Sequence, residues 1–187
     1  GNDSAKVAAL SQKVLDGLHE ENVYGVIKHF PGHGATAGDT HEGYAYTDKS
    51  LEELEQQELV PFQNAIENHI AIIMAGHISV PNVTGDNTPS SLSKIMITDV
   101  LREKMGFDGI VITDALNMGA ISQHYSSAEV SVKVIEAGGD MLLMPENFQE
   151  AYQGILEAVQ NGTLTEERID ESVRRILKVK EKLTAED

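Results

Sequence analysis

Cysteine is absent from the 187 residues of this sequence. Its absence excludes disulfide bonds, zinc sites built from thiolates and a cysteine nucleophile. Long apolar runs are missing as well, because none reaches the roughly 18 residues that a membrane-spanning helix requires. We therefore expect no membrane partner. No signal peptide is visible at Gly1, and the start is typical of the interior of a gene product, so cytoplasmic and secreted locations both stay open.

Basic residues are scarce, with 14 lysines and arginines against 30 aspartates and glutamates and a net charge of −16. Nucleic-acid binding is disfavoured, because phosphate contacts need a basic surface. Adhesion to anionic lipid is disfavoured for the same reason. A hydrophobic share of 41% predicts a folded globular chain, and the length suits one domain with a sizeable core.

Strand and helix patterns alternate along the chain. Strands are predicted over residues 24–30, 70–76, 109–113 and 140–145, and helices over 5–21, 50–69, 93–106, 126–139, 148–162 and 165–183. Pro61 predicts a kink or two helices within 50–69, and the apolar run 70–76 indicates a strand buried on both faces. The alternation favours an α/β fold with parallel pairing. Four such units suit an open doubly wound sheet or half of a TIM (β/α)8 barrel.

In both architectures the chemistry collects at the carboxyl ends of the strands. Three of the four predicted ends carry a polar group suited to chemistry: Lys28-His29, Gly76-His77 and Thr113-Asp114. This clustering is the first indication of a functional site.

The stretch KHFPGHGATAGDTH, residues 28–41, holds three of the seven histidines. A metal site could use His29, His33, Asp39 and His41, but their spacing fits no helical zinc motif. A phosphate cradle could use the glycine amides, but the stretch lacks the P-loop pattern. The third interpretation is an acid–base device, in which Asp39 fixes the tautomer of His41 two residues later. The acid–base interpretation is preferred, and no metal and no cofactor are predicted.

Asp114 follows a buried apolar strand, where an ionised carboxylate is costly unless it serves a purpose. Its other possible role is to cap the next short helix. Paired with His41, it would give a carboxylate nucleophile and a proton donor, which retaining glycoside hydrolysis needs. The usual arrangement has two carboxylates, so a histidine acid would be a departure.

The motifs KHFPGHG, DTH and GFDGIVITDALNMGAI resemble the β-N-acetylglucosaminidase branch of the family 3 glycoside hydrolases, in their order and separation as well. The resemblance runs from about residue 1 to about residue 183. It implies that residues 1–187 are part of a TIM-barrel domain and supply its strands 5 to 8. It also implies removal of terminal β-linked N-acetylglucosamine from bacterial cell-wall or chitin-derived fragments.

The resemblance further implies a role for each motif residue. Asp114 would form the glycosyl-enzyme, and His41, held by Asp39, would act as general acid and then general base. Lys28 and His29 match the pair that binds the sugar hydroxyls. His33 is assigned to loop structure. For His77, lining the substrate pocket and supporting a loop are both considered.

Other functions stay open at this point. A β-glucosidase or a glycoside phosphorylase of the same family is one alternative, and an inactive half-barrel acting as a sugar-binding or assembly module is another. An open half exposes strand edges and the apolar residues meant for the barrel interior. We therefore expect either a homodimer that completes the sheet, which is favoured, or a flatter sheet within one chain.

Overall fold

The structure is a computed structural model that describes residues 2–36 and 45–184. Asp39 and His41, predicted as the acid–base pair, lie outside these described residues. Helices and strands alternate along the described chain in the following order: α1 (Ser4–Glu20), β1 (Val26–Phe30), β2 (Ala45–Tyr46), α2 (Leu51–Gln56), α3 (Val60–Glu67), β3 (Ile72–Ala75), β4 (Ile78–Ser79), α4 (Pro81–Thr84), the 3-10 helix η1 (Ser90–Leu92), the π-helix η2 (Ile95–Lys104), β5 (Ile110–Thr113), α5 (Gly119–Ser122), α6 (Ser127–Ala137), α7 (Phe148–Gln160) and α8 (Glu166–Thr184).

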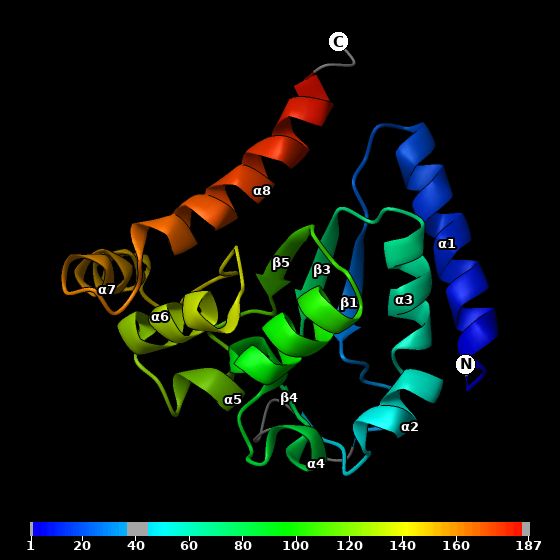
Figure 1. Ribbon diagram of the computed structural model, residues 1–187, viewed down its shortest axis with the longest axis horizontal. Helices are drawn as coiled ribbons and strands as arrows, with labels where there is room; N and C mark the ends of the chain where they lie inside the picture. Colours follow the sequence, from blue (N-terminus) through cyan, green and yellow to red (C-terminus); the bar gives the residue numbers. More distant parts are fainter. Residues whose placement is uncertain (1, 37–44, 185–187) are drawn as a thin grey trace.

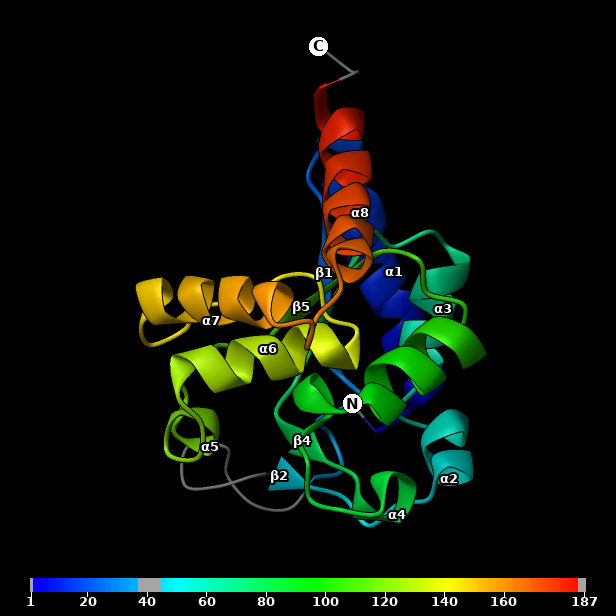
Figure 2. The ribbon, with the colours of Figure 1, turned by 60° about the vertical axis from the view of Figure 1, so that its left-hand side comes forward.

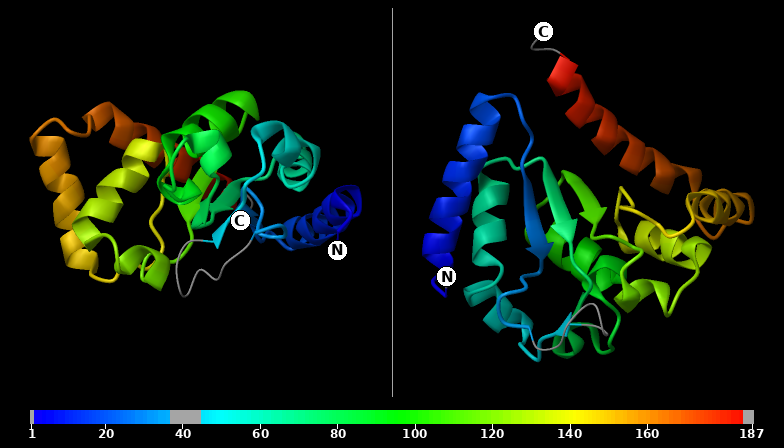
Figure 3. Two further views of the ribbon diagram at one scale, coloured as in Figure 1. Left: turned by 90° about the horizontal axis from the view of Figure 1, so that it is seen from below. Right: turned by 180° about the vertical axis from the view of Figure 1, so that it is seen from behind.

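The central sheet has three parallel strands in the order β1-β3-β5, and their arrows point the same way in Figure 1. A small second sheet pairs β2 with β4. The predicted α/β fold with parallel strands is confirmed. Over residues 2–36 and 45–184 the sheet stays open and does not close into a barrel, as expected for part of one. The three strands are seen side by side from behind in Figure 3, right.

The prediction of a strand over 140–145 is wrong in extent. The structure has only an isolated parallel bridge there, which joins Met141 to Ile112 of β5. The pairing breaks at Leu143, whose backbone N–H donates to the Thr113 hydroxyl at 3.1 Å instead of to a backbone carbonyl. Met144 then adopts a left-handed φ of 48°, which ends the extended run. A side chain thus replaces part of the regular ladder.

The prediction that 70–76 is buried on both faces is also wrong. In β3 the residues alternate, with Ile73 and Ala75 fully buried and Ile72 and Met74 only half-buried. Neighbouring strands share this open face, since Ile112 is half-buried and Val26 is 41% exposed. The sheet therefore has one covered face and one apolar face that the described residues leave partly open.

Helices α3 and η2 supply the side chains that cover the buried face. The main core joins strand residues such as Phe30, Ile73 and Val111 to Phe62 of α3 and Leu101 of η2. Outside this layer α1 packs on α3, and α6 packs on α7, as Figures 1 and 2 show. Within the described part of the chain, no helix is both long and apolar enough to span a membrane.

Local signals account for most helix boundaries. The predicted break at Pro61 is confirmed, because 50–69 forms α2 and α3 with the proline in the first turn of α3. Ser50 and Glu53 form the predicted capping box at the start of α2. The helix expected over 93–106 is present as η2, but it winds as a π-helix and ends before Gly106, whose φ is +78°.

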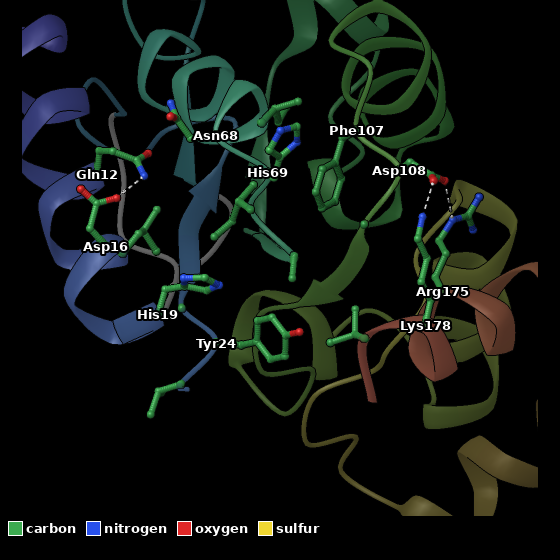
Figure 4. A pocket seen from close by; sticks show the side chains of 18 of the residues that line it. Gln12, Asp16, His19, Tyr24, Asn68, His69, Phe107, Asp108, Arg175 and Lys178 are labelled. Carbon is green, nitrogen blue, oxygen red and sulfur yellow. Dashed lines mark hydrogen bonds and ion pairs between the residues drawn. The ribbon is translucent and has the colours of Figure 1, made fainter. Parts of the chain in front are cut away.

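A cavity of about 930 Å³ lies at the amino ends of the strands (Figure 4). Its lining includes Tyr24 before β1, Ala71 before β3 and Gly109 before β5, together with side chains of α1 and α8. In barrels built from parallel strands, catalysis takes place at the carboxyl ends and the amino ends serve stability. This cavity therefore lies at the opposite end of the sheet from the predicted site.

Candidate functional site

Parallel pairing brings the carboxyl ends of β1, β3 and β5 to one edge of the sheet, and His29 and Asp114 meet there. The Nε2 atom of His29 lies 3.5 Å from Oδ2 of Asp114. Both side chains are about three-quarters buried, with 26% and 23% of their surfaces exposed. A small molecule could therefore reach both groups, while most of each side chain is held by the protein.

The backbone around Asp114 is firmly held. Its own N–H donates to the carbonyl of Ala75 at 2.8 Å, which extends the β3–β5 pairing by one residue. The N–H of Ala115 donates to Asp114 Oδ1 at 2.8 Å. Because Oδ1 accepts this bond, Oδ2 is the carboxylate oxygen that faces His29.

Two glycines allow the close approach around His29. A Cβ atom at Gly76 would lie 3.0 Å from the His29 Cβ, which is tighter than nine in ten real Cβ contacts. Gly32 has a φ of +129°, a conformation that side chains disfavour, and its N–H donates to the His29 carbonyl at 2.7 Å. The peptide bonds Lys28–His29 and Phe30–Pro31 are both cis.

Burial lowers the pKa of His29, and the positive charge of Lys28 acts in the same direction, while Asp114 opposes the shift. His29 is therefore neutral at neutral pH. Its contact with Asp114 is a contact between a neutral ring and a carboxylate, not an ion pair. A neutral imidazole can donate one hydrogen bond and accept another, which suits binding of sugar hydroxyls.

His77 follows β3 and its residue is 1% exposed. Nδ1 lies 2.8 Å from the Ser91 hydroxyl, and Nε2 lies 3.0 Å from the Ala115 carbonyl oxygen. Both ring nitrogens are thus bonded to protein groups, which favours the loop-supporting role over direct contact with a substrate. Nothing in the sequence indicated Ser91 or the Ala115 carbonyl as partners.

The remaining predicted residues are placed as follows. Lys28 is exposed, one residue before His29. The ring of His33 packs edge-on against that of His29 with centroids 6.0 Å apart, and its Nδ1 lies 2.8 Å from the Thr36 hydroxyl. These contacts agree with a structural role in the loop. In the part of the chain that the structure describes, no group of three or more histidines and carboxylates is placed to hold a metal ion.

Comparison with known proteins gives a consistent result. Residues 1–179 match the model of the glycosyl hydrolase family 3 N-terminal domain. The β-hexosaminidase LpqI of Mycobacterium tuberculosis is 34% identical over 96% of this chain and 48% of its own length. The solved family 3 β-N-acetylglucosaminidase of Paenibacillus sp. superposes with a TM-score of 0.92 at 37% identity, over 96% of this chain and 35% of that one.

A β-glucoside phosphorylase, BglX, is similar as well. Its structure superposes with a TM-score of 0.92 at 31% identity, over 98% of this chain and 35% of the phosphorylase chain. The first curated relatives are also longer than this chain, which spans 33% of one of them and 48% of another. The similarity therefore covers nearly all of this chain but only a third to a half of each relative.

Proposed function

We propose that this chain, which belongs to glycosyl hydrolase family 3, carries the catalytic residues of a retaining exo-β-N-acetylglucosaminidase. Residues 1–187 would supply strands 5 to 8 of a TIM barrel. The substrate would be a saccharide with a terminal β-linked N-acetylglucosamine, such as a cell-wall or chitin-derived fragment. The relatives named β-hexosaminidase and β-N-acetylglucosaminidase support this choice of sugar.

The observation that carries the proposal is the position of Asp114. Its carboxylate stands at the end of a strand, is 23% exposed and faces His29 across 3.5 Å. Because the backbone on both sides of it is hydrogen-bonded, the carboxylate is held in one place. A nucleophile must be held within reach of the carbon that it attacks, and such preorganisation is a large part of catalysis.

In the proposed reaction Asp114 Oδ2 attacks the anomeric carbon, and the bond from that carbon to the leaving oxygen breaks. His41 donates its proton to the leaving oxygen, and Asp39 stabilises the imidazolium before this transfer. In the second step His41 takes a proton from water, and the water oxygen displaces Asp114. Two displacements retain the configuration at the anomeric carbon.

Lys28 and His29 would bind the sugar hydroxyls next to the nucleophile. Lys28 is exposed and can donate three hydrogen bonds, and neutral His29 can donate one and accept one. Since His29 lies beside Asp114, a hydroxyl bound to it would place the anomeric carbon near the carboxylate. His77 would not bind the sugar, because both of its ring nitrogens are bonded to protein groups.

The alternative is phosphorolysis, which the similarity to BglX favours as a second candidate. A neutral histidine as acid and base leaves room for an anionic phosphate, which a glutamate would repel.

The test is nitrophenol release by the full-length gene product from nitrophenyl β-N-acetylglucosaminide and β-glucoside, with and without inorganic phosphate. We expect preference for the first substrate and free N-acetylglucosamine as product. A sugar phosphate that appears only with phosphate would establish the alternative, and no turnover of either substrate would contradict both.

For the 187-residue chain expressed by itself, we propose a homodimer in which each copy completes the other's sheet, which also covers the open face. The reason is the apolar surface at that face and at its edge, where Val26 is 41%, Met141 37% and Met144 57% exposed. Light scattering should give twice the monomer mass. A well-folded monomer at micromolar concentration would contradict this assembly.

A further inference from the structure

His77 joins two segments that are distant in sequence. The Ser91 hydroxyl, 14 residues later, contacts Nδ1 at 2.8 Å, and the Ala115 carbonyl, 38 residues later, contacts Nε2 at 3.0 Å. His77 and Ser91 are each 1% exposed. These contacts reach Ala115, the residue after Asp114. None of the three residues has a role in the proposed reaction.

The partners determine the tautomer of His77. A carbonyl oxygen can only accept, so the proton of the neutral ring must be on Nε2, which donates to Ala115. Nδ1 then has a lone pair, and the Ser91 hydroxyl donates to it. Burial lowers the pKa of His77, although the nearby charge of Asp114 opposes this shift, so the ring is neutral at neutral pH.

The residue that His77 holds is the one that fixes the nucleophile, through two adjacent peptide groups that meet at the Cα atom of Ala115. Ala115 receives the His77 bond on its carbonyl and gives its N–H to Asp114 Oδ1 at 2.8 Å. The next residue, Leu116, donates its N–H to the Leu143 carbonyl at 2.9 Å. Rotation of the Ala115 backbone would therefore move the carboxylate, and the bond from His77 opposes that rotation.

We propose that His77 is a positioning residue, which holds the Ala115 carbonyl through Nε2–H, and with it the Ala115 backbone, so that Asp114 Oδ2 stays aimed at the substrate. The inference rests on the proposed role of Asp114 as nucleophile. Ser91 donates to Nδ1 and so holds the ring in the orientation that this bond requires. His77 acts through the backbone and does not touch the sugar.

The test compares two amide replacements in the full-length gene product. In His77→Gln the side-chain nitrogen can occupy the place of Nε2 and keep the bond to Ala115, whereas in His77→Asn the shorter side chain can reach Ser91 only. A misplacement of about 1 Å can cost about 100-fold in rate. We expect His77→Asn to lower kcat for nitrophenyl N-acetylglucosaminide by about that factor with KM nearly unchanged. His77→Gln should recover most of this loss.

Two results would overturn the inference: wild-type kcat in a folded His77→Asn variant, or equal losses in the two variants. If His77→Asn does not fold, Ser91→Ala takes its place. This variant removes the hydroxyl that holds Nδ1 and should lower kcat about tenfold, as removal of an outer hydrogen-bond partner does at metal sites. Unchanged kcat in Ser91→Ala would then contradict the positioning role.

A second measurement does not depend on turnover. The NMR amide resonance of Ala115 reports its bond to Asp114 Oδ1, and imidazole nitrogen shifts report the tautomer of His77. We expect an Nε2–H tautomer, and an Ala115 amide that shifts in His77→Asn but not in His77→Gln. If the wild type had no glycosidase activity, the proposed function would fail, and these shifts would still decide whether His77 holds the Ala115 backbone. An Ala115 amide that stays in place in His77→Asn would overturn the inference.

Discussion

Asp114→Asn in the full-length gene product should abolish nearly all turnover of nitrophenyl N-acetylglucosaminide. Loss of a nucleophile costs about 10⁶ in kcat in a well-studied hydrolase, and a loss of several orders of magnitude is expected here. The amide has nearly the same shape and can still accept the Ala115 N–H, which Asp114 Oδ1 accepts at 2.8 Å. The fold should therefore persist, while the negative charge that must attack the anomeric carbon is gone.

The matched control is Asp99→Asn, which removes an aspartate on the exposed side of η2. It should leave kcat and the thermal midpoint close to the wild-type values. If Asp114→Asn kept a third of wild-type turnover while correctly folded, Asp114 would not be the nucleophile. Thermal unfolding of both variants separates lost chemistry from lost structure.

The second large effect concerns stability and the buried carboxylate of Asp140, whose side chain is fully buried. Oδ2 accepts Arg102 Nη2 at 2.6 Å and the N–H of Val111 at 2.9 Å. Oδ1 accepts the Ser172 hydroxyl at 2.7 Å and Arg175 Nη1 at 3.1 Å. One carboxylate thus joins η2, β5 and α8. Of its partners Figure 4 labels Arg175, which also reaches toward Asp108.

Asp140→Asn should lower the free energy of unfolding by about 3–5 kcal/mol, because it leaves buried guanidinium groups without their countercharge. Arg102 donates to this carboxylate directly and Arg168 lies 4.0 Å from it, with 11% and 17% of their side chains exposed. Burial already lowers the pKa of both arginines, and Asp140 opposes that shift. Denaturant unfolding measures the difference.

The control for this prediction is Asp170→Asn on α8. Asp170 is 62% exposed and pairs only at the surface with Arg174, so its loss should change stability little. If the two variants unfolded at the same denaturant concentration, the network around Asp140 would not be a main source of stability. Asp140 was not among the residues that the sequence pattern indicated.

The sequence predicted the parts of the fold that depend on local patterns. The break at Pro61 follows from the missing N–H of proline, and the capping box at Ser50 follows from its spacing to Glu53. Placing His29, His77 and Asp114 at strand ends required only the alternation of strands and helices. Parallel pairing then put the three residues at one edge of the sheet.

The parts that could not be predicted depend on contacts between distant residues. Thr113 disrupts the ladder at Leu143 through its side chain, and no periodic pattern contains this information. The half-open face of β3 depends on what covers it, since a run of apolar residues reads alike with one or two covered faces. The bonds from His77 to Ser91 and Ala115 are also long-range and became visible only in the folded chain.

The close approach at Gly76 has a consequence for how the site can vary. An added methyl group there would meet His29 Cβ at 3.0 Å and the Ile78 side chain at 3.3 Å. The ends of β1 and β3 therefore approach so closely that residue 76 has little room for any side chain. The distance between the ends of these two strands, and with it the position of His29 beside Asp114, therefore depends on the missing side chain at position 76.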